Sequence, residues 1–177
     1  MERGLFVVTG IMASGKTTVG QLLAERFARG VHVHGDIFRR MIVTGREEMR
    51  PDASDEAMAQ LRLRYRLAAA ATDGYVEAGF SVVLQDVVIG PMLTELVEMI
   101  RSRPLHLVVL CPRPEVVAAR EAARNKRGYV TWDVAGLDRI LREETPRIGM
   151  WLDSSEQTPE ETVEAIWQRA WTEAVIG

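Results

Sequence analysis

The segment that most constrains the fold is a loop of eight residues, Gly10-Ile11-Met12-Ala13-Ser14-Gly15-Lys16-Thr17, with a glycine at its start and a second one before its lysine. A short apolar run without polar alternation, residues 5–8, precedes it, which is typical of a strand buried on both faces. Between residues 16 and 28, apolar side chains recur at spacings of three and four, which predicts an amphipathic helix ending near Gly30. The sequence therefore predicts a strand, a loop and a helix in direct succession.

The loop matches the pattern G-x-x-x-x-G-K-[ST] of a P-loop. Its glycines let the backbone curl so that successive N–H groups point at phosphates, while Lys16 offers a charge to the β and γ groups and Thr17 offers a hydroxyl to Mg²⁺. A glycine turn with a surface lysine is the alternative, and the flanking strand and helix argue against it. We therefore predict ATP with Mg²⁺ as the ligand. The predicted nucleotide-binding residues of the loop are Gly10, Ile11, Met12, Ala13, Ser14, Gly15, Lys16, Thr17 and Thr18.

The rest of the chain alternates between short apolar runs and helical spacings. Further strands are predicted at residues 31–34, 80–84, 105–110 and 148–152, with helices at about 54–79, 91–101, 115–123, 134–144 and from 159 onward. Parallel strands need crossover connections, so this alternation predicts an α/β fold with a five-stranded parallel sheet and helices on both faces. We expect residues 1–177 to form a single domain. Segments 44–53 and 124–132 interrupt the alternation and are candidate lids over the carboxyl edge of the sheet, where ligands bind.

Composition narrows the class of protein. With 47% apolar and 27% charged residues and a net charge of -3, the chain has the composition of a globular protein with no general attraction to nucleic acid or anionic membrane. The single cysteine, Cys111, excludes an internal disulfide, and neither a secretory signal nor an apolar run of 18 residues is present. We therefore expect a cytoplasmic protein whose partners include neither membrane nor nucleic acid.

Asp86 ends the third predicted strand and resembles the acidic group that holds magnesium in P-loop proteins. Its alternative role is to cap the turn that leads to Pro91. The next residue is Val87, whereas many motor-type ATPases have a water-activating glutamate there. This difference favours transfer of a phosphate to a bound acceptor over hydrolysis.

Asp36 follows the second predicted strand. A carboxylate at this edge can accept the proton of an acceptor hydroxyl as it attacks the γ-phosphate. Asp36 could also cap the helix that contains Phe38, and both roles are compatible. We expect the acceptor to contact a set of residues near this edge: Asp36, Arg40, Met41, Arg62, Tyr65 and Asp86.

A basic segment follows the fourth predicted strand, and it contains Arg120, Arg124, Lys126 and Arg127. Arginines in this position can close over a triphosphate and stabilise the charge that develops during transfer. A solvated basic turn is the alternative. We predict catalytic and nucleotide-binding roles for Arg120 and Arg124.

Nearly the whole chain resembles the small P-loop kinases, which include gluconate and shikimate kinases, and most of all the members similar to chloramphenicol phosphotransferase and tunicamycin-resistance ATP-binding proteins. The resemblance lies in GIMASGKT, in HGD ending at Asp36, in VVLQDVV around Asp86 and in VVLCPRPEVVAAREAAR ending at Arg124. It implies a three-layer P-loop kinase fold, with Asp36 as the base and a lid formed by the arginines after the fourth strand. It also implies that residues 154–159 border the adenine.

Together these features predict an ATP-dependent phosphotransferase that moves the γ-phosphate to a hydroxyl of a small molecule, a metabolite or an antibiotic. The metal-binding residues would be Thr17 and Asp86, and the catalytic residues would be Lys16, Asp36, Arg120 and Arg124. Two alternatives stay open. One is a nucleotide or polynucleotide 5′-hydroxyl kinase, and the other is an ATP-dependent binding protein or switch that transfers no phosphate.

Overall fold

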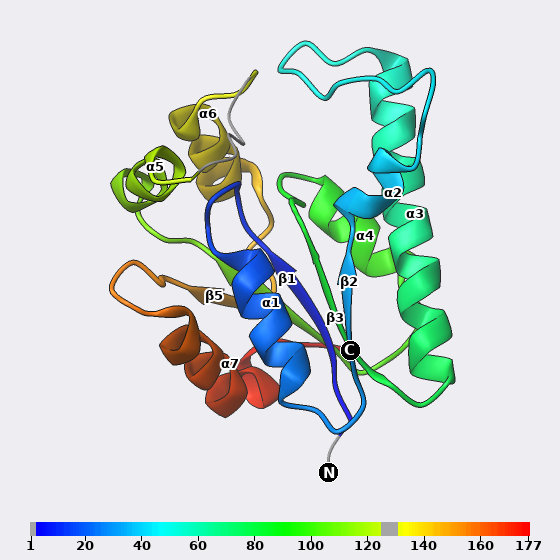
Figure 1. Cartoon of the computed structure of the whole chain (residues 1–177), viewed down its shortest axis with the longest axis vertical. Helices are drawn as coiled ribbons and strands as arrows, with labels where there is room; N and C mark the ends of the chain where they lie inside the picture. Colours follow the sequence, from blue (N-terminus) through cyan, green and yellow to red (C-terminus); the bar gives the residue numbers. More distant parts are fainter. Residues whose placement is uncertain (1–2, 125–130) are drawn as a thin grey trace.

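The computed structural model describes residues 3–124 and 131–177, and five parallel strands form its centre in the order β2-β3-β1-β4-β5 (Figure 1). The strands are β1 (Leu5–Thr9), β2 (Gly30–His34), β3 (Ser81–Asp86), β4 (Leu105–Leu110) and β5 (Met150–Leu152). The predicted five-stranded parallel sheet is confirmed. A two-residue strand that we did not predict, β6 (Val175–Ile176), pairs antiparallel with the start of β4.

Helices cover both faces of the sheet, which confirms the predicted three-layer arrangement (Figure 1). On one face lie α1 (Lys16–Glu25) and α7 (Pro159–Glu173), and on the other lie α3 (Asp55–Glu77), α4 (Met92–Met99), α5 (Pro114–Ala122) and α6 (Val134–Arg139). Side chains of β1 alternate between the two cores: Phe6 and Val8 pack with α1 and α7, and Val7 packs with the opposite layer. Every residue of β1 is buried, as its uninterrupted apolar sequence predicted.

Local sequence signals define where two of the longer helices begin. The Ser54 hydroxyl accepts a hydrogen bond of 3.1 Å from the Ala57 amide at the start of α3. At the start of α7, Thr158 and Glu161 form a reciprocal capping box, in which each side chain accepts from the other residue's amide. These bonds satisfy amide groups that a helix leaves unpaired at its first turn.

The predicted helix at 134–144 has a different form in the structure. It consists of α6 followed by a π-helical turn, Ile140–Glu144. The Thr145 hydroxyl donates a hydrogen bond of 2.9 Å to the Ile140 carbonyl, five residues earlier, and so satisfies an acceptor at the wide turn. The predicted strand at 148–152 is also shorter, since only Met150–Leu152 pairs with β4.

The loop after β1, the short helix α2 (Asp36–Arg40) and the segment that joins α2 to α3 all lie at the carboxyl edge of the sheet (Figure 1). The candidate lid 44–53 belongs to this joining segment. Of the other candidate lid, 124–132, residues 125–130 lie outside the described residues, among them Lys126 and Arg127. The hydroxyl of Thr131 and the indole N–H of Trp132 donate to the Met49 carbonyl at 3.5 and 3.2 Å. The two segments thus meet over one edge.

None of the described helices combines the length and the apolar character needed to cross a membrane.

Candidate active site

The loop between β1 and α1 has the backbone shape that phosphate binding requires. Gly15 has a φ of 95° and Ala13 a φ of 63°, both in the left-handed region, and the Ser14 amide donates to the Ile11 carbonyl at 3.2 Å. The Ser14 hydroxyl is buried and has no hydrogen-bond partner among the described residues. A buried polar group of this kind is normally satisfied, and a phosphate oxygen at the start of α1 would satisfy it. The loop therefore fits the phosphates of a nucleotide.

Lys16 is buried, with 8% of its surface exposed, and its Nζ donates to the Ile11 carbonyl at 3.2 Å. Burial lowers the pKa of this amine to about 8, although the nearby Asp86 carboxylate partly opposes the shift. The positive charges of Arg124 and Arg64 lower the pKa further. A bound phosphate would supply the negative charge that this partly desolvated cation lacks.

Asp86 lies at the end of β3, directly beside Thr9 of β1 in the parallel register. Only 3% of its surface is exposed. Its carboxylate accepts two hydrogen bonds from the Arg64 guanidinium, one of 2.8 Å from Nε and a shorter one from Nη2, and it also accepts one of 2.7 Å from the Val87 amide. Arg64 comes from α3, and its side chain is 12% exposed. Asp86 therefore lies next to the loop, and its charge is compensated by a largely buried arginine.

Asp36 occupies the first position of α2, one residue after a glycine that packs tightly on Asp86. A Cβ atom at Gly35 would lie 2.0 Å from the Asp86 Oδ2, so only glycine lets the end of β2 approach so closely. The Asp36 carboxylate lies 3.0 Å from the Arg40 Nε and 3.5 Å from the Arg64 Nη1, and its side chain is 40% exposed. Arg64 thus joins the two predicted site aspartates, which come from α2 and β3.

Thr17 and Asp86 were predicted to hold Mg²⁺. The described residues contain no group of three or more acidic, histidine or cysteine side chains that could hold a metal on its own. Mg²⁺ that accompanies a nucleotide is typically held by one or two side chains, with phosphate oxygens and waters completing the shell. Thr17 is exposed at the start of α1, and Asp86 lies beside Thr9, the last residue before the loop. Both residues therefore fit such a role.

The arginines after β4 lie in different environments. Arg120 of α5 donates to the Ser14 carbonyl at 3.3 Å and to the Ser154 carbonyl at 3.1 Å, so it connects the P-loop to the segment before α7. Arg124 is 41% exposed and pairs with Glu121 at 3.2 Å. The positive charge of Arg124 is one of those that lower the pKa of Lys16.

The residues predicted to contact the acceptor lie in different surroundings in the structure. Arg40 pairs with Asp36, and Met41 lines a pocket of about 220 Å³ between α2 and α3. Arg62 pairs with Glu95 of α4 at 2.9 Å. Tyr65 is only 2% exposed and donates to the Val87 carbonyl at 2.9 Å. Of the six predicted acceptor residues, Met41 alone is among the described residues that line the pocket, and Asp36, Arg40, Arg62, Tyr65 and Asp86 are not.

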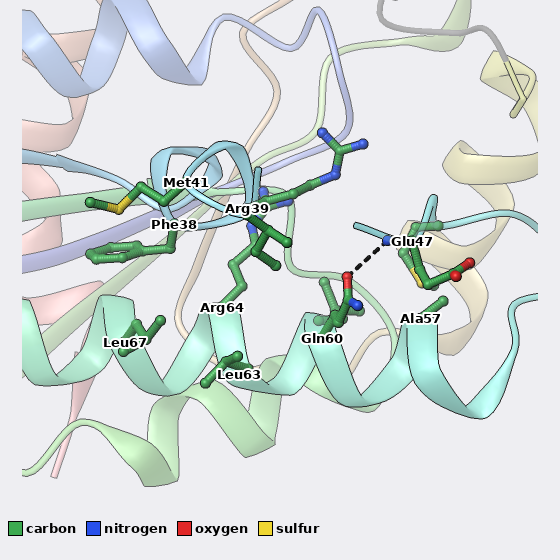
Figure 2. A pocket seen from close by; sticks show the side chains of 12 residues that line it. Phe38, Arg39, Met41, Glu47, Ala57, Gln60, Leu63, Arg64 and Leu67 are labelled. Carbon is green, nitrogen blue, oxygen red and sulfur yellow. Dashed lines mark hydrogen bonds between the residues drawn. The ribbon is translucent and has the colours of Figure 1, made fainter. Parts of the chain in front are cut away.

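The pocket lies between α2 with the segment after it and one face of α3 (Figure 2). Phe38 and Met41 are on its α2 side, and Leu63 and Leu67 are on its α3 side. Arg64 also lines it, so one arginine connects the pocket to the two aspartates. Neither aspartate is among the described residues that line the pocket.

The comparisons with known proteins agree with this geometry. A family model described as an AAA domain matches residues 5–145, which include the P-loop, both aspartates and the arginines after β4. The chain belongs to this AAA domain family. No curated protein sequence matches the chain.

Solved structures show the same fold as this AAA-family chain. An unliganded sugar kinase from Janibacter sp. HTCC2649 has a TM-score of 0.68 at 20% identity, covering 98% of this chain and 96% of its own. The tunicamycin resistance protein of Deinococcus radiodurans has a TM-score of 0.67 at 16% identity, covering 99% of both chains. An APS kinase from Mycobacterium tuberculosis, in complex with AMPPNP and APS, has a TM-score of 0.69 at 15% identity. The match covers 95% of this chain and 98% of the APS kinase. The predicted likeness to small P-loop kinases is confirmed at the level of the fold.

Arg64 is the residue of this AAA-family site that the sequence analysis missed. The signal was its position on α3, where it lies on the same stripe as Leu61 and Ala68, at spacings of three and four residues. A charged residue on the buried stripe of a helix needs an opposite charge nearby. The sequence alone did not show that β3 carries that charge to the same place.

Proposed function

We propose that the protein is an ATP-dependent phosphotransferase that moves the γ-phosphate to a hydroxyl group of a small molecule. The observation that carries this proposal is the meeting of Asp36 and Asp86 around Arg64, beside the P-loop, together with the pocket that Arg64 also lines. A protein that only binds ATP needs neither a second carboxylate nor a pocket at this edge. Membership of the AAA domain family and the fold shared with several kinases support the nucleotide half of the proposal.

At the nucleotide end, the loop amides and Lys16 would bind the β and γ phosphates. Thr17 and Asp86 would hold Mg²⁺, which neutralises phosphate charge when it is bound. For Asp86 to serve in this way, the guanidinium of Arg64 has to share or release the carboxylate oxygens that it now contacts. Arg120, which already contacts the Ser14 carbonyl, and the nearby Arg124 would stabilise charge on the transferred group.

At the acceptor end, Asp36 would accept the proton of the hydroxyl while that oxygen attacks the γ-phosphate and ADP leaves. Arg40 and Arg64 contact one carboxylate oxygen each, and these contacts orient the carboxylate. Val87 follows Asp86, so the chain has no glutamate at the position where many ATPases activate water. Transfer to an acceptor bound beside Asp36 is the reaction that this arrangement favours.

The proposal is tested with γ-labelled ATP, Mg²⁺ and pooled hydroxylated metabolites, antibiotics and 5′-hydroxyl oligonucleotides. With an active acceptor, Asp36→Asn should lower kcat by about 10²–10⁴-fold and leave the Kd for ATP unchanged. Asp52→Asn, which changes an exposed carboxylate at the same edge, is the matched control and should retain full activity.

Three results would contradict the proposal. If Asp36→Asn transfers phosphate as fast as the wild-type protein, Asp36 is not the base. Tight ATP binding with no labelled product from any pool would favour a binding protein or switch. Label on the oligonucleotides alone would favour a polynucleotide 5′-hydroxyl kinase.

A further inference from the structure

We infer that the acceptor is a neutral alcohol with a largely apolar body, an inference that rests on the proposed function. The pocket between α2 and α3 reaches the reacting groups through Arg64, which lines the pocket and also contacts Asp36 and Asp86. Neither aspartate lines the pocket itself, so a bound molecule would have to extend its hydroxyl past Arg64 to reach Asp36. The rest of that molecule would contact the pocket walls, so the walls decide its chemical class.

The walls are mostly apolar. Eight of the twelve described residues that line the pocket carry apolar side chains, and they come from α2, α3 and the segment between them. Leu63 and Leu67 on α3 face Phe38 and Met41 across the pocket (Figure 2). Met41, Leu63 and Leu67 remain 70%, 37% and 41% exposed. Large apolar side chains that gather in one hollow and stay accessible mark a binding surface.

The polar groups of the walls are mostly occupied within the protein. Arg39 forms an ion pair with Glu48. Gln60 donates to the Gly45 carbonyl at 2.8 Å and accepts from the Glu47 amide at 2.9 Å, the bond drawn in Figure 2. A site built for a polyhydroxylated acceptor needs groups ready to pair with each hydroxyl, because buried hydroxyls left unpaired cost free energy. The walls of this pocket would contact such an acceptor mainly with apolar side chains, so most of its hydroxyl groups would find no partner.

The charges around the pocket also disfavour an anionic acceptor. The described ionisable side chains that line the pocket or contact its charged groups are Arg39, Arg40, Arg64, Asp36, Glu47, Glu48 and Asp86. Three arginines thus face four carboxylates, and each arginine already contacts at least one of them. Among the described residues that line the pocket, each arginine is already paired, so a carboxylate or phosphate group on the acceptor would have to compete with Glu48 or Asp86 for it. Sugar acids and phosphorylated acceptors therefore fit this pocket poorly.

The test measures binding and transfer separately on the full chain. Binding of 1-butanol, 1-pentanol and 1-hexanol is measured by ligand-observed NMR in the presence of AMPPNP and Mg²⁺, and transfer to the same alcohols is measured with γ-labelled ATP. Each methylene that enters the pocket should tighten binding about fourfold. Gluconate, shikimate and hexane-1,2,6-triol serve as anionic and polyhydroxylated probes, and each should bind at least about tenfold more weakly than 1-hexanol.

Two variants of similar exposure give the matched control. Leu67 lines the pocket and is 41% exposed, whereas Ile37, at 48% exposed, is not among the described lining residues. Leu67→Gln should weaken 1-hexanol binding about four- to fifteenfold and reduce the gain per methylene, while Ile37→Gln should change neither. Because both positions are partly exposed, both variants should fold, and thermal unfolding checks this.

The outcomes separate the inference from the proposed function. A chain-length gain that Leu67→Gln reduces, without phosphate transfer, supports the apolar pocket and contradicts the proposed transferase activity. Transfer to gluconate, shikimate or the triol with no chain-length gain supports the transferase and overturns the apolar acceptor. Equal losses in Leu67→Gln and Ile37→Gln would also overturn the inference, because the effect would then not come from the pocket.

Discussion

Replacement of Arg64 by alanine tests the central contact of the site. Asp86 is 3% exposed, and Arg64 supplies two of the three hydrogen bonds that its carboxylate accepts from the described residues. Of these three bonds, Asp86 would keep in Arg64→Ala only the one of 2.7 Å from the Val87 amide. Removal of one partner from a buried ion pair leaves an uncompensated charge and costs about 3–5 kcal/mol. For a chain of 177 residues, this loss corresponds to a fall in Tm of about 6–20 °C.

The same helix provides a matched control. Arg62 makes an equally bidentate contact with Glu95, with bonds of 2.9 and 3.2 Å, but both side chains are exposed. Arg62→Ala should therefore have a much smaller effect than Arg64→Ala, because solvent already screens that pair. The free energy of unfolding is measured by urea titration, followed by circular dichroism and tryptophan fluorescence, with linear extrapolation to water.

A second substitution decides whether charge is the cause. In Arg64→Ala with Asp86→Asn, the uncompensated carboxylate is absent, so part of the lost stability should return. If Arg64→Ala is no more destabilising than Arg62→Ala, or if Asp86→Asn adds a full further loss, the buried pair does not stabilise the fold as argued.

Three further outcomes are expected. Burial lowers the pKa of Lys16 from 10.5 to about 8, so between these pH values the unfolded chain holds one more proton than the folded protein. The free energy of unfolding should therefore rise by about 3 kcal/mol from pH 8 to 10.5. The affinity for ATP, measured by calorimetry, should fall above pH 8 because Lys16 loses its charge. Gly35→Ala places a Cβ 2.0 Å from the Asp86 Oδ2 and should cost about 1–3 kcal/mol in urea unfolding, with a loss of transfer activity. Trp132→Phe removes the bond of 3.2 Å to the Met49 carbonyl and should raise the acceptor KM about two- to tenfold without changing the Kd for ATP. The Lys16 argument is contradicted if the free energy of unfolding does not change from pH 8 to 10.5. The other two arguments are contradicted if Gly35→Ala is as stable and active as the wild type, or if Trp132→Phe leaves the acceptor KM unchanged.

Much of the fold could be predicted because its signals are local. The buried run 5–8, the glycine loop and the helical spacing after it depend on neighbouring residues only. The run and the loop appear where the pattern put them, whereas the helix begins at Lys16 as predicted but ends at Glu25, before the predicted end near residue 28. Thr158 with Pro159 likewise marked the start of α7. The pairing of β6 with β4 could not be predicted, since two residues near the end of the chain carry too short a pattern to indicate a partner.

The candidate site was predicted only in part, because its contacts join segments that are distant in sequence. Asp36 and Asp86 were identified as strand-end carboxylates, and their roles stay predictions. From the sequence we predicted that Arg62 and Tyr65 of α3 contact the acceptor, whereas the pocket is lined by other residues of that helix, Arg64 among them. One residue along a helix turns a side chain by about 100°, so the choice of residue depends on how the helix is rotated against the sheet.

The P-loop of residues 10–17 and the alternation of strands and helices follow from the sequence by itself, because backbone shape at glycines and the burial of apolar runs are properties of short segments. Only the tertiary structure decided that Arg64 joins Asp36 to Asp86 and that the same arginine lines an apolar pocket. Those contacts depend on the strand order β2-β3-β1 and on the packing of α3 across it, which bring together residues up to 50 positions apart. Nucleotide binding is thus predicted by a local motif, whereas the chemistry at the acceptor is a property of the packed fold.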